Sequence, residues 1–235
     1  MKHRLIRIRR RALAAPVALA ALVSFPGLSA EALPLLSEVY YDAVGSDDGQ
    51  SFVELFGVPG TVLDELRIEV VNGANGAVVA TLPLSGVIGP TGLFVVADRF
   101  SDGGTAVPVF DQLLNFDIQN GPDSVVLVGP DGVLDALGFG AFESGEIFAG
   151  EGTAAPAVPA GSSLARVFAN VDTDDNALDF VELLAPTPGE APIHPVPEPA
   201  TGLLSAAGAL GLGWLGRRRS RPRRPHDRQR RPAPQ

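Results

Sequence analysis

The chain has 235 residues, no cysteine and a formal net charge of −9, but this charge is unevenly distributed. Residues 31–216 contain three Arg against 26 acidic residues, a formal charge of −23, whereas the other 15 cations lie at the two ends. The absence of cysteine excludes disulfides, thiolate catalysis and zinc–thiolate sites. A body with three cations cannot neutralise a run of phosphates, so a nucleic-acid-binding function is disfavoured.

The N-terminus has the three parts of an export signal. A basic segment, MKHRLIRIRRR, precedes the apolar segment ALAAPVALAALVSF, and the small residues that follow allow cleavage after Ala30 or Ala32. We therefore predict a signal peptide over residues 1–30, removed by signal peptidase after export by the general secretory route. The alternative is a permanent N-terminal anchor, which is disfavoured because the apolar segment is short.

Residues 31–190 have the length of one domain and a β pattern throughout. Short segments rich in Val, Leu and Phe alternate with turns rich in Gly, Pro, Asn and Asp, and no stretch keeps a helical period over three turns. This pattern predicts an all-β sandwich. The predicted strands are 35–41, 51–58, 65–71, 77–84, 93–98, 123–129, 133–140 and 162–168.

Alternation assigns the faces of the predicted strand in SFVELF. Because successive side chains of a strand point to opposite faces, Val53 and Leu55 share one face, and Phe52 and Glu54 share the other. We expect Val53 and Leu55 to face the core. Glu54 is then expected to face solvent or a neighbouring polar group.

The body lacks most of the residues that common hydrolytic mechanisms require. His194 is the one histidine between residues 31 and 216, and it lies in a Pro-rich segment unsuited to positioning a catalytic base. Paired carboxylates are abundant, but glycoside hydrolases usually also need aromatic platforms. The body has no Trp, and its tyrosines, Tyr40 and Tyr41, fall in the first strand. The Gly-rich segments are typical of turns and not of phosphate-binding loops. We predict a non-enzymatic protein.

The densest group of possible metal ligands lies in NVDTDDNALDF. Asp172, Asp174 and Asn176 alternate as the first ligands of an EF-hand loop do, and Asp179 follows them. The segment is not an EF-hand, because alanine and leucine stand where the turn glycine and the bidentate glutamate belong.

Two interpretations of this segment stay open. In one, its four oxygen-bearing residues begin a calcium site, which a second loop completes with Asp42, Asp47 or Asp48. In the other, the segment is a solvated loop whose Asx side chains cap local turns. Asp179 and Phe180 then begin the last strand, with Phe180 in the core.

The C-terminal part contains a second membrane-sized segment. A Pro-rich linker at 191–199 precedes 17 uncharged residues at 200–216. At about 1.5 Å per residue, a helix of this length spans roughly 25 Å, the lower limit for crossing a bilayer. Positive residues favour the cytoplasmic side, so Arg217, Arg218 and Arg219 would hold the tail in the cytoplasm. We predict a single transmembrane helix with the acidic body outside.

The order of these parts resembles the PEP-CTERM sorting signal of Gram-negative bacteria. Its motif corresponds to Val196, Pro197, Glu198, Pro199 and Ala200. The apolar helix and the basic tail at 217–235 follow in the family's order. In that family a membrane-embedded, transpeptidase-like enzyme, an exosortase, recognises the Pro-Glu-Pro element and cleaves nearby. The resemblance implies processing by an exosortase. The alternative is an ordinary single-span anchor after a chance Pro-rich linker.

Four blocks of the body resemble the lamin tail domain, which occurs in nuclear lamins and in many bacterial secreted proteins. The family's S-E-V and F-V-E-L start corresponds to LLSEVYYDAVGSDDGQSFVELFG, and its F-V-V-A block to LSGVIGPTGLFVVAD. The Q-N-G-x-D hairpin corresponds to IQNGPDSVVLVGPDGVLDALGFG. The closure, with S-L-x-R, D-T-D-x-N, D-F and T-P-G, corresponds to GSSLARVFANVDTDDNALDFVELLAPTPG. The family's frequent Gly-Trp pair is missing from LDELRIEVVNG. The resemblance implies an immunoglobulin-like β-sandwich over residues 31–190.

Together these expectations describe an exported, exosortase-sorted, non-enzymatic protein of the cell surface or extracellular polysaccharide matrix, anchored at first in the inner membrane. The matrix is implied by the family alone, because exosortase systems resemble parts of polysaccharide export loci. The alternative is a cell-envelope hydrolase that uses clustered carboxylates, with or without a metal. The fold by itself identifies no binding partner.

Overall fold

The body of the chain is built almost entirely from β-strands, as the alternating pattern predicts. The computed structural model describes residues 33–195. In chain order, its strands are β1 (Leu35–Tyr40), β2 (Phe52–Phe56), β3 (Arg67–Asn72), β4 (Val78–Pro83), β5 (Leu93–Asp98), β6 (Gln112–Leu114), β7 (Asp123–Gly129), β8 (Gly132–Phe139), β9 (Ser163–Arg166) and β10 (Phe180–Leu183). A short helix, α1 (Asn176–Asp179), directly precedes β10. All eight predicted segments are confirmed as strands, β5 and β7 with the predicted bounds.

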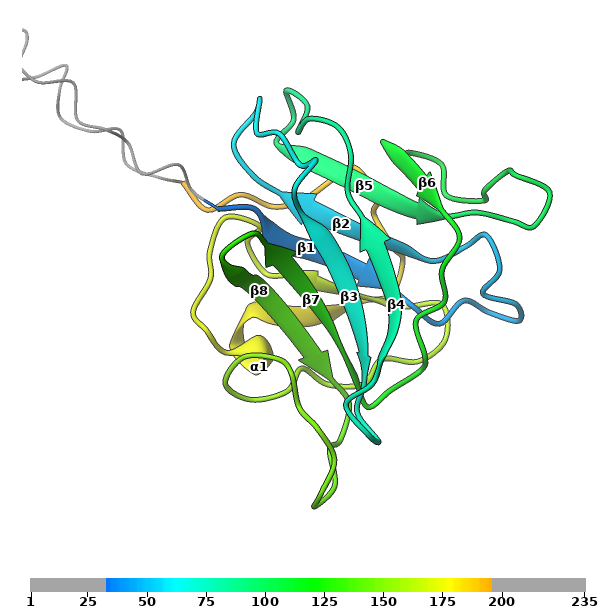
Figure 1. The fold of residues 1–235 in the computed structure, drawn as a ribbon, viewed down its shortest axis with the longest axis vertical. Helices are drawn as coiled ribbons and strands as arrows, with labels where there is room; N and C mark the ends of the chain where they lie inside the picture. The colour runs from blue at the N-terminus through cyan, green and yellow to red at the C-terminus, as the bar shows by residue number, and fades with distance from the viewer. Residues whose placement is uncertain (1–32, 196–235) are drawn as a thin grey trace, which may run out of the picture. The chain divides into compact units, whose positions relative to one another are not determined.

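The strands form two sheets (Figure 1). One sheet has six strands in the order β10-β9-β1-β2-β5-β6, and the other has four in the order β4-β3-β7-β8. Neighbouring strands are antiparallel, except that β6 runs parallel to β5. The edge strand β6 was missed, because three residues are too few to show alternation. Phe180 begins β10 and is 1 % exposed, as expected, but Asp179, which was expected in the same strand, is the last residue of α1.

The two sheets face each other across one hydrophobic core. The six-stranded sheet contributes Val39, Leu55 and Phe94 among others, and the four-stranded sheet contributes Val70 and Leu127. Each of these side chains is at most 2 % exposed. Two sheets that bury one face each against the other form a two-layered β-sandwich.

The predicted register of β2 is confirmed. Val53 and Leu55 lie in the core between the sheets, each 0 % exposed. Phe52 belongs to a smaller, separate apolar cluster. Glu54 is buried as well, and its carboxylate accepts a hydrogen bond from the hydroxyl of Ser37 at 2.8 Å. The polar group expected beside Glu54 is therefore Ser37.

The two ends of the chain lie outside the described residues. The predictions that fall there are the signal peptide at 1–30, the sorting motif at 196–200, the apolar helix at 200–216 and the tail that begins with Arg217, Arg218 and Arg219. Within residues 33–195, no helix has the length and apolar character needed to cross a bilayer.

Leu55→Ala should lower the free energy of unfolding by about 2–5 kcal/mol, because it removes a fully buried side chain from the core between the sheets. Urea denaturation followed by circular dichroism measures this change. Val133 in β8 is 62 % exposed and offers a matched control. Val133→Ala should change the free energy by less than about 0.5 kcal/mol. A loss that small for Leu55→Ala would show that the core does not depend on this face of β2.

Candidate functional site

The centre of the candidate site is a buried guanidinium ion. Arg166 is the last residue of β9 and is 1 % exposed. Its Nε donates to the carbonyl of Leu36 at 2.9 Å, and its Nη2 donates to both carboxylate oxygens of Asp135 at 2.9 and 2.8 Å. Its Nη1 donates to Asp179 at 2.8 Å and to Asp172 at 3.3 Å. A buried cation is tolerated only when it is paired and hydrogen-bonded in this way.

Segments that are remote in the sequence meet at this ion. Asp135 in β8 also accepts a hydrogen bond from the backbone N–H of Leu36 in β1 at 2.6 Å. The ladder between β1 and β9 ends at Glu38, so the N–H and carbonyl of Leu36 find their partners in Asp135 and Arg166. The guanidinium carbon also lies 4.6 Å from the ring centroid of Phe180 in β10, a cation–π contact.

Two side chains anchor the Asp-rich segment to the body. Beyond its ion pair, Asp179 accepts from the backbone N–H of Thr173 at 2.9 Å and from its hydroxyl at 2.8 Å. Asn176 is 0 % exposed. Its Oδ1 accepts from the backbone N–H groups of Gly138 at 2.8 Å and Glu151 at 2.9 Å, and its Nδ2 donates to a carbonyl of β8 at 2.7 Å. These oxygens already have protein partners.

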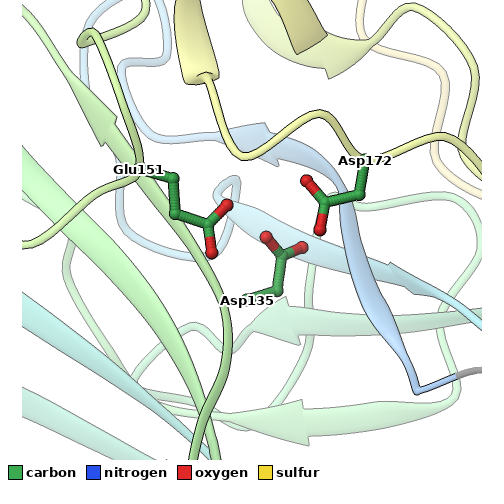
Figure 2. A group of neighbouring side chains, drawn as sticks. All are labelled: Asp135, Glu151 and Asp172. Carbon is green, nitrogen blue, oxygen red and sulfur yellow. The ribbon is translucent and has the colours of Figure 1, made fainter.

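Three carboxyl groups lie together beside this ion (Figure 2). They come from Asp135 in β8, from Glu151 in the long loop after β8, and from Asp172 in the Asp-rich segment. Each offers an oxygen within 4.8 Å of the other two. Figure 2 shows the three carboxyl groups turned toward a common point. Hard oxygens in this arrangement could hold a divalent cation.

Burial and the closeness of these carboxyl groups raise the pKa of Glu151. Burial, followed by the nearby carboxyls of Asp135 and Asp172, raises the pKa of Glu151 to about 8, against the opposing effect of Arg166. Among the described residues, Oε2 of Glu151 is buried without a hydrogen-bond partner. Burial also raises the pKa of Asp135, although Arg166 lowers it. Glu151 therefore keeps its proton at neutral pH, and a cation bound here would displace that proton.

The structure divides the four predicted calcium ligands. Asp172 joins the three-carboxyl group, whereas Asp179 and Asn176 are bound by the protein itself. Asp174 has a positive φ of 55° and donates its backbone N–H to Asp172 at 3.1 Å. Calcium bound by this set of four stays a prediction.

The residues predicted to complete the calcium site lie elsewhere in the fold. Asp47 and Asp48 line a hollow of about 300 Å³ together with Asp98 and Asp117. The carbonyl of Asp42 accepts a hydrogen bond from the backbone N–H of Gly161 at 2.7 Å. The three-carboxyl group contains none of these residues.

Sequence reasoning missed Asp135 and Glu151. In VLDALGF, alternation places Asp135 on the same face as Leu137 and Phe139, which both lie in the core. An acid at an inward position of an apolar strand was the available signal, because such a residue needs a buried partner. Glu151 lies in an irregular loop and gave no comparable signal.

A second group of buried carboxyls lies between β1 and β2. Glu38 and Glu54 are direct cross-strand partners and are 1 % and 0 % exposed. Ser163 donates to Glu38 at 2.5 Å, and Ser37 donates to Glu54 at 2.8 Å. A register shift between Leu36 and Glu38 marks a β-bulge, which lets Ser37 and Glu38 serve the same face. Burial raises the pKa of both carboxyls, that of Glu54 to about 7.

Polar residues of the sequence blocks quoted above meet in these two groups. The blocks S-L-x-R, D-T-D and D-F supply Arg166, Asp172 and Asp179 to the first group. The blocks S-E-V and F-V-E-L supply Glu38 and Glu54 to the second. In both groups these residues hold strands and loops of the body together.

Glu151→Gln should flatten the pH dependence of stability. The pKa of Glu151 is about 8 in the folded chain against an ordinary value of 4.5. The folded state therefore binds more protons in this window, and its stability falls as the pH rises from about 4.5 to about 8. Glutamine does not titrate, so the variant should lose less melting temperature across this window in calorimetry. Glu143→Gln, at an exposed position, controls for the loss of one carboxyl. Parallel profiles for wild type and Glu151→Gln would contradict the expectation.

Calcium should raise the melting temperature if it binds only the folded chain. Magnesium at equal concentration controls for general screening of a body with a formal charge of −23. If the four predicted ligands hold the ion, Asp174→Asn should erase the calcium-specific gain. Erasure by Glu151→Gln alone would instead assign the ion to the three-carboxyl group. An equal rise in melting temperature with the two ions would show that the Asp-rich segment has no specific calcium site.

Comparison with known proteins identifies the C-terminal part of the chain. No curated protein and no solved structure matches the chain, and no family model supports its resemblance to the lamin tail domain. Residues 195–219 match the family model described as the PEP-CTERM protein-sorting motif. The chain therefore carries a PEP-CTERM sorting motif, which implies an exported protein with a transient membrane anchor and sorting by an exosortase.

Proposed function

We propose that this chain is a non-enzymatic protein of the cell surface or extracellular matrix. Its β-sandwich, of the lamin-tail-like and immunoglobulin-like type, serves as a structural or binding module. The observation that carries the proposal is the sorting-motif match at residues 195–219, which begins where the described body ends. A signal of this kind delivers the body to a membrane-embedded processing enzyme, so the body acts outside the cytoplasm.

The use of polar side chains in the body supports a non-catalytic role. A catalytic group has to be free to bind or protonate a substrate. The donors of Arg166 are directed to acceptors of the protein itself, and both oxygens of Asp135 accept from that guanidinium. His194, the one histidine within residues 33–195, is exposed, with its ring edge-on to Phe168 at 5.1 Å. These groups stabilise the fold.

Glu198→Ala should block processing while leaving the export signal and the anchor intact. In a host that has an exosortase, the mature wild type should lack roughly the first 30 residues and the segment after the Pro-Glu-Pro element. Intact-mass measurement of the cell-associated protein distinguishes this form from the unprocessed one. The variant should accumulate a species that still carries Trp214 and the Arg-rich tail.

Glu190→Ala is the matched control, because it removes a carboxyl eight residues upstream of Glu198. The side chain of Glu190 is exposed, and only its backbone makes hydrogen bonds within the described residues. This variant should be processed like the wild type. Wild-type protein that retains Trp214 in such a host would contradict the proposal and leave an ordinary anchor.

The second candidate function is a cell-envelope hydrolase. One observation favours it: Glu151 has a pKa of about 8 and lies beside two other carboxyl groups. A carboxylic acid that keeps its proton at neutral pH next to other carboxyls is the arrangement used for general acid catalysis. The purified protein should be assayed on polysaccharides and phosphoesters. Turnover that Glu151→Gln abolishes would favour the hydrolase, and absence of turnover would favour the structural or binding role.

A further inference from the structure

The segment between β10 and the sorting motif is fastened to the body. We name residues 184–195, orange in Figure 1, the C-terminal strap. A free linker would allow the processing enzyme to approach the motif without contact with the folded body. The strap instead makes two sets of hydrogen bonds to the sandwich and one set of apolar contacts.

The first attachment is to the buried pair Glu38 and Glu54. Thr187 donates its backbone N–H to Glu38 at 2.9 Å and its hydroxyl to the other oxygen of Glu38 at 2.8 Å. Gly189 donates its N–H to Glu54 at 2.6 Å. Acidic side chains directly opposite each other on paired strands are destabilising. The strap supplies three of the five hydrogen bonds that these carboxyls accept, so it compensates for their burial.

Two prolines of the strap lie beside a hollow at the small apolar cluster outside the main core. Pro186 and Pro188 line a hollow of about 140 Å³ together with Tyr40 and Phe52. Phe52 belongs to that cluster, and Tyr40 packs against it. The strap thus borders an apolar hollow of the six-stranded sheet in addition to binding its carboxyls.

The second attachment lies just before the sorting motif. The carbonyl of Pro192 accepts from the N–H of Ala169 at 2.8 Å. Asn170 binds both backbone groups of His194: its Nδ2 donates to the carbonyl at 3.0 Å, and its Oδ1 accepts from the N–H at 2.7 Å. The ring of His194 also packs edge-on against Phe168.

These attachments limit how far the motif can lie from the folded body. Glu198 follows His194 by four residues and Leu184 by fourteen. An extended chain spans at most about 3.6 Å per residue, so Glu198 lies within roughly 14 Å of His194 while the strap is closed. Release of the strap back to Leu184 extends this limit to roughly 50 Å. A segment held by a folded protein is attacked through its locally opened state.

We propose that the strap withholds the sorting motif from the exosortase, so that opening of the strap sets the rate of processing. This inference rests on the proposed function, because it requires that the motif is processed. In the closed state the chain is bound to the sandwich up to His194, two residues before the motif begins. In the open state Glu38 and Glu54 become hydrated, so the lost hydrogen bonds are replaced by water.

The test compares processing rates of full-length variants in a host that has an exosortase, by pulse-chase labelling. Thr187→Val with Asn170→Ala removes three of the hydrogen bonds that join the strap to the body. These losses are expected to raise the open fraction, and with it the processing rate, about tenfold or more. Asn75→Ala changes an exposed asparagine in the turn between β3 and β4, and should leave the rate unchanged.

A second variant tests the reach of the motif without removing any contact between the strap and the sandwich. Six Gly and Ser residues inserted between Pro195 and Val196 leave the strap contacts of the described residues in place, yet extend the reach of the motif by up to roughly 20 Å. This insertion should also accelerate processing. Unchanged or slower processing in either variant would overturn the inference. Acceleration by the double substitution alone would also overturn it, since general destabilisation would then be the cause.

Glu198→Ala in the same host separates this inference from the proposed function. If the wild type is processed, Glu198→Ala is not, and the strap variants match the wild type, only the inference fails. If the wild type is never processed, the proposed function fails, and the inference fails with it.

Discussion

The guanidinium of Arg166 is the interaction on which the rest of the body depends. It joins β9 to β1 through Leu36, to β8 through Asp135 and to the Asp-rich segment through Asp179. Loss of one partner from such a buried pair costs about 3–5 kcal/mol, because the remaining charge is left uncompensated. A domain of this size has only about 5–15 kcal/mol of stability in total. The segment between β9 and β10 is therefore fixed to β1 and β8 by one cation.

The two clusters of buried carboxyls are stabilised by different means. The group around Arg166 is paired with a cation, and the excess negative charge there is relieved by the proton on Glu151. The pair Glu38 and Glu54 is held by neutral donors from two serines and from the strap. With pKa values of about 8 for Glu151 and about 7 for Glu54, the body carries less negative charge at pH 7 than its composition indicates.

The strands could be predicted from the sequence because alternation and turn residues are local signals. Val53 and Leu55 face the core for the reason that the pattern gives. The pattern could not show that Glu54 is buried, since its outer face is covered by a strap more than a hundred residues further along the chain. The three residues of β6 are too few to show alternation, and their parallel pairing with β5 depends on the fold of the whole sheet.

The candidate site was less predictable, because its members are brought together by topology. The Asp-rich segment was found from its composition, but Asp135 and Glu151 come from a strand and a loop far from it. Alternation of oxygen ligands in a sequence does not show which of them the fold has already engaged. Here Asn176 and Asp179 bind backbone and guanidinium groups, and Asp172, one of the two other carboxyls of the set, joins partners that composition could not name.

The position of β1 has a consequence for the order in which the chain folds. β1 is the first strand of the body, yet it lies between β2 and β9 in the sheet. Leu36 binds Arg166 across 130 residues, so a chain that emerges N-terminus first exposes one side of β1 until β9 arrives. Contacts of such sequence separation form slowly, because a long loop must be closed before they contribute. The sandwich is completed only when almost the whole body has emerged, and the strap, which follows β10, is the last part able to close. A closed strap is therefore a sign that folding is finished.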